Sequence, residues 1–248
     1  YSDVEVEKEI KVINHLKQKG VKVPTYVKCL NDNYSFVYKE KTIIMQEFIE
    51  GYIIEPNNGD YAQAIESATN LGKIIQGLED FPFPLPTSDL SSWYSKESFV
   101  NSKKKHFDIL NMLNDNQIDK KIKDDITDKI RILDNIMTNF DFSEMSNLTC
   151  KNTHGDYSVM QFIYKDGKIN AIIDFVSACK MPIVWEVIRS YSYIDEKAKD
   201  GEFDINNFID YVKEFCKYVS LNKYDIKYMP YLYMIQLLNS TYGYKQFL

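Results

Sequence analysis

The sequence predicts an α+β fold in which a small part, made of one helix and a few strands, precedes a larger and mainly helical part. Two observations lead to this prediction. The hydrophobic period is close to two between residues 34 and 45 and changes to 3.6 after Gly51. A second strand-like stretch, residues 152–175, interrupts the helical part. We therefore expect a partial N-terminal lobe with its hinge at residues 1–51 and a helical C-terminal lobe at residues 52–248.

The first part begins with an amphipathic helix over residues 2–19. Ser2-x-x-Glu5 is a capping box, in which the two side chains satisfy each other's backbone donors at the start of the helix. The apolar stretches 34–38 and 42–45 flank a short charged segment, which predicts a hairpin. The second of these strands is expected to run on until Gly51 breaks it.

Helical periodicity dominates the second part. It covers residues 61–78, 93–113, 117–138, 184–194, 206–219 and 227 onward. Within the strand-like stretch, Asp166-Gly167 separates the apolar runs 162–164 and 169–173, and an Asp-Gly pair is a strong signal for a tight hairpin turn.

The composition excludes some classes of function. The chain has 248 residues, is 44% hydrophobic and carries a formal net charge of −6, which argues against a general binder of nucleic-acid backbones. No apolar run approaches the roughly 18 residues that a membrane span needs. The four cysteines are widely spaced, and we expect reduced, mostly buried thiols in a cytoplasmic protein that binds neither nucleic acid nor membrane. The oligomeric state does not follow from the sequence.

The segment around Asp156 carries the main chemical signal. Asp156 follows Thr153-His154-Gly155 in a loop after a strand-like stretch, where a carboxylate can accept the proton of an attacking hydroxyl. Asp174 interrupts an apolar run, and a charge at the end of a buried strand costs several kcal/mol unless it is paired or binds a metal. Magnesium prefers one or two carboxylates together with water and phosphate oxygens. The alternative is that both aspartates only form turns.

Gln161 is the third residue of this constellation. It lies five residues beyond Asp156 and could offer a carboxamide oxygen to a second metal ion. The alternative, a polar residue at the start of a strand, stays open from the sequence.

Together these residues resemble the aminoglycoside phosphotransferase and choline kinase family, a branch of the protein-kinase-like fold. The family signature H-G-D-x-x-x-x-N followed by I-D-[FW] has its counterpart in His154-Gly155-Asp156-x-x-x-x-Gln161 and Ile173-Asp174-Phe175. The resemblance implies a two-lobe fold, ATP and Mg²⁺ as cofactors, Asp156 as catalytic base and Asp174 as main metal ligand. Gln161 would replace the asparagine that binds the second metal, and His154 would orient the loop rather than act as a base.

The resemblance extends to other segments. Residues 45–51 look like the hinge between the lobes, where backbone groups around Glu47 and Ile49 would hydrogen-bond the adenine edge of ATP. Glu9 resembles the helix glutamate that pairs with a phosphate-binding lysine, although it could equally be a solvated residue of the helix face. Glu186 falls near a position that is acidic in the family, with a structural role.

The family's Gly-rich loop and phosphate-binding lysine have no counterpart before Glu9. We expect both to lie N-terminal to Tyr1 in a longer chain; the alternative is that the protein has no such phosphate-binding segment. The leading hypothesis is an ATP-dependent phosphotransferase that acts on a hydroxyl of a small molecule, aminoglycoside-like, choline-like or similar. The alternative is an inactive kinase-fold protein with a binding or structural role, such as a spore-coat relative. Gln161 and the missing loop favour this alternative, whereas Asp156 and Asp174 favour the enzyme.

Overall fold

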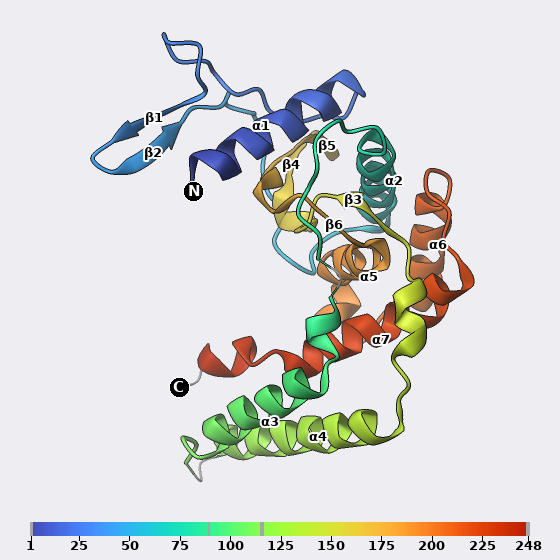
Figure 1. Cartoon of the computed structure of the whole chain (residues 1–248). Helices are drawn as coiled ribbons and strands as arrows, with labels where there is room; N and C mark the ends of the chain where they lie inside the picture. The colour runs from blue at the N-terminus through green and yellow to red at the C-terminus, as the bar shows by residue number, and fades with distance from the viewer. Residues whose placement is uncertain (1, 89, 115–116, 247–248) are drawn as a thin grey trace. The chain divides into compact units, whose positions relative to one another are not determined.

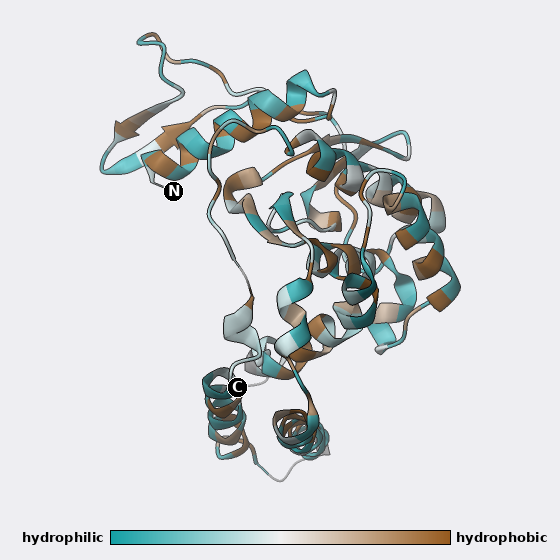
Figure 2. Cartoon of the chain, turned by 45° about the vertical axis from the view of Figure 1, so that its right-hand side comes forward, coloured by the Kyte–Doolittle hydropathy of each residue, from teal (hydrophilic) through white to brown (hydrophobic). Residues whose placement is uncertain are grey.

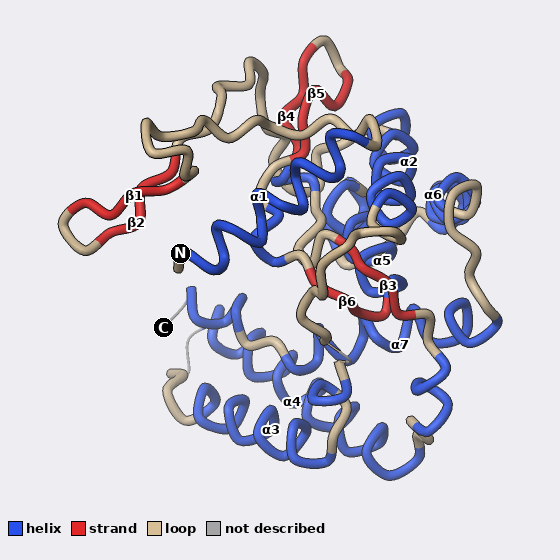
Figure 3. The backbone as a smooth tube through the Cα atoms, turned by 45° about the horizontal axis from the view of Figure 1, so that its top comes forward, coloured by secondary structure: helices blue, strands red, loops and turns tan. Residues whose placement is uncertain are grey.

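The computed structural model describes residues 2–88, 90–114 and 117–246. Contacts group the chain into two compact units, the first made of Tyr1–Ser88 with Thr149–Asn222 and the second of Asp89–Leu148 with Lys223–Leu248. Helices dominate both units and the strands are short (Figure 3). The architecture is the predicted α+β fold, while the proposed lobe boundary at residue 51 stays a prediction.

The first unit holds all the strands of the described chain. Its elements are α1 (Asp3–Gln18), β1 (Ser35–Tyr38), β2 (Lys41–Ile44), α2 (Tyr61–Gly77), β3 (Cys150–Thr153), β4 (Phe162–Lys165), β5 (Lys168–Ile172), β6 (Cys179–Pro182), α5 (Ile183–Ile194) and α6 (Ile205–Phe215). The strands form three antiparallel pairs, β1–β2, β3–β6 and β4–β5. Both predicted hairpins are confirmed.

Local sequence determines α1 and the β4–β5 turn. The Ser2 side chain accepts the Glu5 N–H and the Glu5 side chain accepts the Ser2 N–H, so the predicted capping box is confirmed. Apolar and polar residues alternate along α1 (Figure 2), and its apolar positions from Val6 onward are buried. At the turn, Asp166 and Gly167 both have positive φ, 51° and 74°, as a two-residue hairpin loop requires.

The core of the first unit lies around α2. This helix contacts α5, α6, β3 and β5, and it lies beside α6 in Figure 1. Its apolar face is fully buried, including Ala68, Leu71, Ile74 and Ile75. Burying side chains of this size contributes roughly 1.5–3 kcal/mol each. The helix therefore supplies the rigid support on which the β3 loop rests.

The second unit is helical in its described residues. It consists of α3 (Lys96–Leu110), α4 (Gln117–Asn139) and α7 (Lys223–Asn239) with short 3₁₀ turns. Phe99 and Leu133 pack with Ile235 and Leu238 in one cluster. The helices predicted here are confirmed, although α3 begins later than residue 93, after a separate 3₁₀ turn at Ser91–Trp93.

Three elements differ from the expectations. β6 was not predicted, because its alternation of apolar and polar residues lasts only from Cys179 to Met181 before Pro182, too short a signal without its pairing with β3. The strand before Asp156 begins at Cys150, two residues before the strand-like stretch predicted from residue 152, and Ser143–Asn147 forms a separate 3₁₀ turn. The helix predicted over residues 206–219 ends at Phe215.

The four cysteines form no disulfide in the described residues, as expected, but they are not mostly buried. Cys179 is buried, Cys29 is intermediate, and Cys150 and Cys216 are exposed. Cys150 is exposed at the first position of β3, and Cys216 caps the end of α6. No helix of the described residues combines the length and the apolar character that crossing a bilayer requires.

The close approach of α2 to the segment after α6 leads to a prediction. A Cβ at Gly72 would lie 2.8 Å from the Tyr218 Cβ, so Gly72→Ala should lower the free energy of unfolding by roughly 1–3 kcal/mol, although alanine is the better helix former. Denaturant unfolding measures this change. In a Tyr218→Gly background, which lacks the contacting Cβ, the loss should shrink, and an equal loss in both backgrounds would contradict the packing explanation.

Candidate active site

The loop after β3 can follow its path only with glycine at position 155. Gly155 has φ +87°, and a Cβ built on it would lie 1.9 Å from the Ser177 carbonyl oxygen. The loop therefore passes directly against the short 3₁₀ turn Phe175–Ser177, which follows Asp174. Because of this close approach, the backbone brings the segments of Asp156 and Asp174 together.

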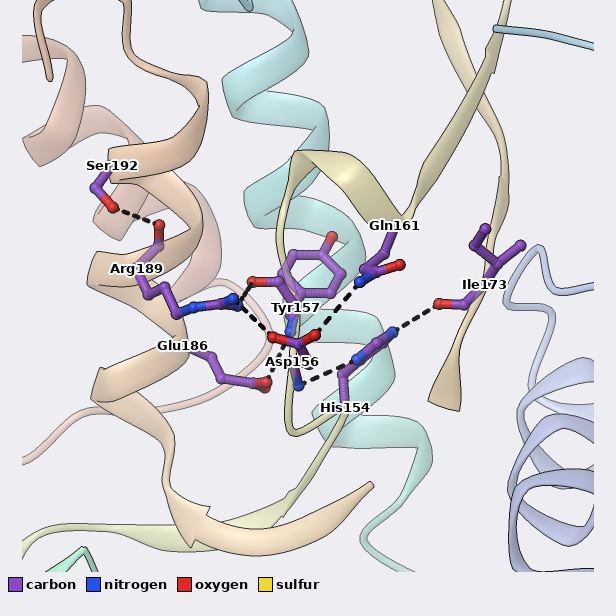
Figure 4. A network of polar contacts seen from close by, with 8 residues as sticks. All are labelled: His154, Asp156, Tyr157, Gln161, Ile173, Glu186, Arg189 and Ser192. Carbon is purple, nitrogen blue, oxygen red and sulfur yellow. Dashed lines mark hydrogen bonds and ion pairs between the residues drawn. The ribbon is translucent and has the colours of Figure 1, made fainter. Parts of the chain in front are cut away.

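His154 joins the same two segments by hydrogen bonds. Its Nδ1 accepts the Asp156 N–H at 3.3 Å, which leaves Nε2 to carry the proton and to donate to the Ile173 carbonyl at 3.0 Å. The ring is fully buried and its centroid lies 4.4 Å from that of Phe175. Burial lowers the pKa of His154 to about 4. The ring is therefore neutral and orients the loop, as expected from the sequence, and both of its nitrogens are occupied (Figure 4).

Glu186 on α5 holds the rest of the loop. Its buried carboxylate accepts the Tyr157 N–H at 3.0 Å, the Thr153 hydroxyl and the Gly155 N–H. Burial raises the pKa of Glu186, and the hydrogen bonds act in the opposite direction. Its structural role is confirmed.

Asp156 lies at the open end of this framework. Its side chain is 43% exposed, and its Oδ1 forms an ion pair of 2.6 Å with Nη2 of Arg189. Its Oδ2 accepts a long hydrogen bond of 3.4 Å from Nε2 of Gln161. Figure 4 shows the carboxylate between these two side chains. Asp156 is thus held in one orientation while remaining accessible.

Asp174 has the features of a metal ligand. It is half-buried and takes a left-handed conformation with φ 66°. Burial and, secondly, the charge of Asp156 raise its pKa. Among the residues that the structure describes, its carboxylate has no hydrogen-bond or ion-pair partner. A half-buried carboxylate that has no partner, and whose pKa is raised by the charge of a second carboxylate, fits the binding of a cation.

Gln161 is the second candidate metal ligand. Gln161 is half-buried at the end of a 3₁₀ turn, and its backbone carbonyl accepts the Ile173 N–H at 3.0 Å. One carboxylate and one carboxamide suit Mg²⁺ that is shared with phosphate oxygens, rather than a site made of protein ligands alone. The described part of the chain holds no cluster of three or more His, Cys, Asp or Glu side chains able to bind a metal.

Glu9 is not a solvated residue of the helix face. It is 4% exposed, and its Oε1 accepts the Phe175 N–H at 2.9 Å. Tyr26 adds a side-chain hydrogen bond, and burial raises the pKa of Glu9. The neighbouring Lys8 donates to the Val176 carbonyl at 2.5 Å. The structure therefore brings α1 to the Asp174 segment through two adjacent side chains.

Glu47 and Ile49 lie apart from this network. Glu47 is exposed, and its N–H donates to the Thr25 carbonyl at 2.8 Å, so this N–H is already engaged within the chain. Neither residue has a recorded hydrogen bond to Asp156, Gln161 or Asp174 within the described residues. Their role in nucleotide binding stays a prediction.

Arg189 is the site residue that sequence reasoning missed. It follows Glu186 by three positions, so both side chains project from the same face of α5. Its Nη1 also donates to the Tyr157 carbonyl at 3.1 Å. The spacing of three residues between Glu186 and Arg189 could have indicated this role. An acidic and a basic side chain on the same face of a buried helix both need polar partners.

Two carboxylates of the acidic stretch 195–204 are engaged in local contacts. Asp195 accepts the N–H groups of Lys197 and Asp204, and Asp204 forms an ion pair of 2.7 Å with Lys197. These carboxylates cap turns and the start of α6.

Comparison with known proteins gives a consistent result. The model of the phosphotransferase enzyme family, APH, matches residues 1–214. No curated protein matches the chain. The fold resembles that of the amicoumacin kinase hAmiN in complex with AMP-PNP, Ca²⁺ and Ami, with TM-score 0.63, 14% identity, and coverage of 96% of this chain and 69% of the other.

Two further solved structures have the same fold. An aminoglycoside phosphotransferase from Alicyclobacillus acidocaldarius has TM-score 0.61 and 14% identity, over 98% of this chain and 75% of the other. The spectinomycin phosphotransferase APH(9)-Ia in complex with ADP and spectinomycin has TM-score 0.62 and 12% identity, over 94% and 69%. At these identities the similarity establishes the fold, which is the predicted protein-kinase-like fold.

The contact of Gly155 with Ser177 can be tested with a matched glycine. Gly167 also has positive φ, but a Cβ there would meet no atom within 4 Å. Gly167→Ala should therefore cost only backbone strain, on the order of 1–2 kcal/mol, whereas Gly155→Ala should cost clearly more. Denaturant unfolding of the two variants measures the difference. Equal losses would show that the close approach does not constrain the loop.

The buried, neutral state of His154 makes stability depend on pH. Its pKa is depressed from 6.5 to about 4 on folding, so its contribution is fully present above pH 6.5 and is lost as the pH falls toward 4. At pH 5 this single group should cost about 2 kcal/mol. By NMR the ring should keep the neutral Nε2–H form down to pH 5, and the same ring should titrate near 6.5 in denaturant. Titration near 6.5 in the folded protein would contradict this assignment.

Proposed function

The chain belongs to the phosphotransferase enzyme family, and on that premise we propose that it transfers the γ-phosphoryl group of ATP to a hydroxyl of a small molecule. The observation that supports the proposal most strongly is the convergence of Asp156 and Asp174. His154 bonds to the Asp156 N–H and to the Ile173 carbonyl, and the charge of Asp156 contributes to the raised pKa of Asp174. Two costly carboxylates in one half-buried place fit a metal-nucleotide site better than a structural role.

Each carboxylate has a separate task in this proposal. Asp156, which is exposed and held by Arg189, orients the acceptor hydroxyl and takes its proton. Asp174 and Gln161 would hold Mg²⁺ with the nucleotide phosphates. When bound, the ion supplies neutralisation of the negative charge on the phosphoryl oxygens. Glu9 keeps the Asp174-Phe175 backbone in place through its bond to the Phe175 N–H.

The nucleotide would bind next to the segment 45–51. We assign the adenine edge to the Glu47 carbonyl and the Ile49 N–H, since the Glu47 N–H is occupied by Thr25. The structures of similar fold that contain AMP-PNP or ADP support a nucleotide in this role.

In the proposed transfer, the acceptor oxygen forms a bond to the γ-phosphorus while the bond from that phosphorus to the bridging oxygen breaks. ADP leaves with the electron pair of the broken bond, and the hydroxyl proton passes to Asp156.

Alanine substitutions at the two aspartates should affect nucleotide binding and turnover differently. Asp174→Ala should weaken Mg²⁺·ATP binding at least tenfold, because the metal loses its carboxylate ligand. Asp156→Ala should keep that binding and lower turnover by about 10²–10⁴-fold, because the proton acceptor is lost. Nucleotide-dependent thermal shifts and ATP turnover measure the two effects. Asp210→Ala removes an exposed carboxylate from α6 and serves as the control.

The same assay separates the two hypotheses about the protein. Absence of both a nucleotide-dependent shift and turnover in the wild type would overturn the kinase proposal and favour an inactive kinase-fold protein. Identical behaviour of the Asp156 and Asp174 variants would contradict the division of roles.

A further inference from the structure

A cavity lies between α1 and the loop that enters β1, within the first unit. Its volume is about 480 Å³, which is in the usual range of a small-molecule site. One wall is a single face of α1, from Asp3 to Asn14, and the other is formed by residues 32–35. α1 runs beside the β1–β2 hairpin (Figure 1), and the Thr42 hydroxyl of the hairpin donates to Oδ1 of Asp3 at 3.2 Å.

Both walls offer apolar surface to the cavity. Val6 and Ile10 line it from α1 and are buried, with 3% and 5% of their surface exposed. Tyr34 lines it from the loop and is half-buried. A ligand with an apolar body can therefore be held between the helix and the loop.

The carboxylates of the walls are not equally compensated. Glu7 forms an ion pair of 2.6 Å with Lys11, which also lines the cavity. Asp32 forms a longer and more exposed pair of 3.5 Å with Lys28. Among the described residues, Asp3 forms no ion pair and accepts only the hydrogen bond from the hairpin. One carboxylate is thus left without a cation at the N-terminal end of the cavity.

The start of α1 offsets part of the charge of Asp3, because a helix N-terminus carries a partial positive charge of roughly half an elementary charge. A full counter-charge has to come from a ligand. The apolar surface begins close by, since Val6 and Ile10 follow Asp3 by three and seven positions, which corresponds to roughly 5 and 10 Å along the helix axis.

We propose that this cavity binds a small amphiphilic amine. Its ammonium group pairs with Asp3, and an apolar group one to two helical turns away lies against Val6, Ile10 and Tyr34. A neutral molecule of the same shape lacks the ion pair, and a carboxylate is repelled by Asp3.

This site is separate from the proposed active site, and the inference does not rest on the proposed function. Among the described residues, the walls of the cavity include none of Asp156, Gln161 and Asp174. Glu9 does not line it either, because its carboxylate accepts the Phe175 N–H. Binding of the amine should therefore need neither metal nor nucleotide.

The test compares three probes that differ in charge: 4-phenylbutylamine, 4-phenylbutanol and 4-phenylbutyrate. Each is titrated at low salt into the 248-residue chain and followed by the chemical shifts of the backbone amides. The amine should shift signals of α1 and residues 32–35, and it should bind at least about fivefold more tightly than the alcohol, because an ion pair near the surface is worth at least about 1 kcal/mol. Equal affinities, tighter binding of the carboxylate, or shifts confined to other segments would overturn the proposal.

A variant shows whether Asp3 causes the preference. Asp3→Asn should lower the affinity for the amine to that for the alcohol, while binding of the alcohol reports that the cavity is intact. Asp166→Asn removes an exposed carboxylate from the β4–β5 turn and should keep the preference. An unchanged preference in Asp3→Asn would contradict the assignment.

Competition separates this cavity from the proposed active site. The amine has no hydroxyl, so it cannot accept a phosphoryl group. Its affinity should be the same with and without saturating Mg²⁺·ATP, and the same in Asp174→Ala as in the wild type. Loss of amine binding in the presence of Mg²⁺·ATP would place the amine at the nucleotide site and overturn the proposal.

Discussion

The position of the proposed base depends on a buried carboxylate that takes no part in the chemistry. Glu186 has no exposed surface, and ionised carboxylates are costly to bury without partners. Here the partners are the Thr153 hydroxyl and the N–H groups of Gly155 and Tyr157, all from the loop after β3. The loop and the carboxylate therefore stabilise each other. Any other course of the loop would leave a buried charge and several backbone donors unsatisfied.

From Glu186 the constraint extends through the whole site. The loop positions His154, whose ring donates a hydrogen bond to the Ile173 carbonyl. Two residues after Ile173, the Phe175 N–H donates to Glu9 on α1. Each step is a hydrogen bond of a buried or half-buried group, which is expensive to break. The separation of Asp156 and Asp174 is thus set by α5 and α1 together. This explains why Asp174 keeps a left-handed backbone, since both neighbours of the residue are held.

The sequence predicted what depends on local patterns. The capping box of α1, the Asp-Gly turn and the Asp156–Asp174 spacing all lie within short stretches, and the structure contains the first two as expected. The sequence could not predict contacts that form only when distant segments come together in the folded chain. The bond from Glu9 to Phe175 spans 166 positions, β6 exists only by pairing with β3, and Arg189 meets Asp156 only after α5 has packed on the loop. Such contacts have no local signature, because tertiary packing decides them.

Gln161 and Arg189 together define how an acceptor can approach the base. The Gln161 amide nitrogen, and not its oxygen, faces Asp156, since two oxygens would repel each other. Its contact of 3.4 Å is long, whereas the ion pair of Oδ1 with Arg189 is short at 2.6 Å. Displacing the Gln161 amide from Asp156 costs less free energy than displacing Arg189. We therefore infer that Oδ2 of Asp156 receives the hydroxyl proton and that the acceptor enters on the Gln161 side. The side chain of Gln161 therefore has a role beyond its proposed part in metal binding, because its amide also contacts the carboxylate proposed as the base.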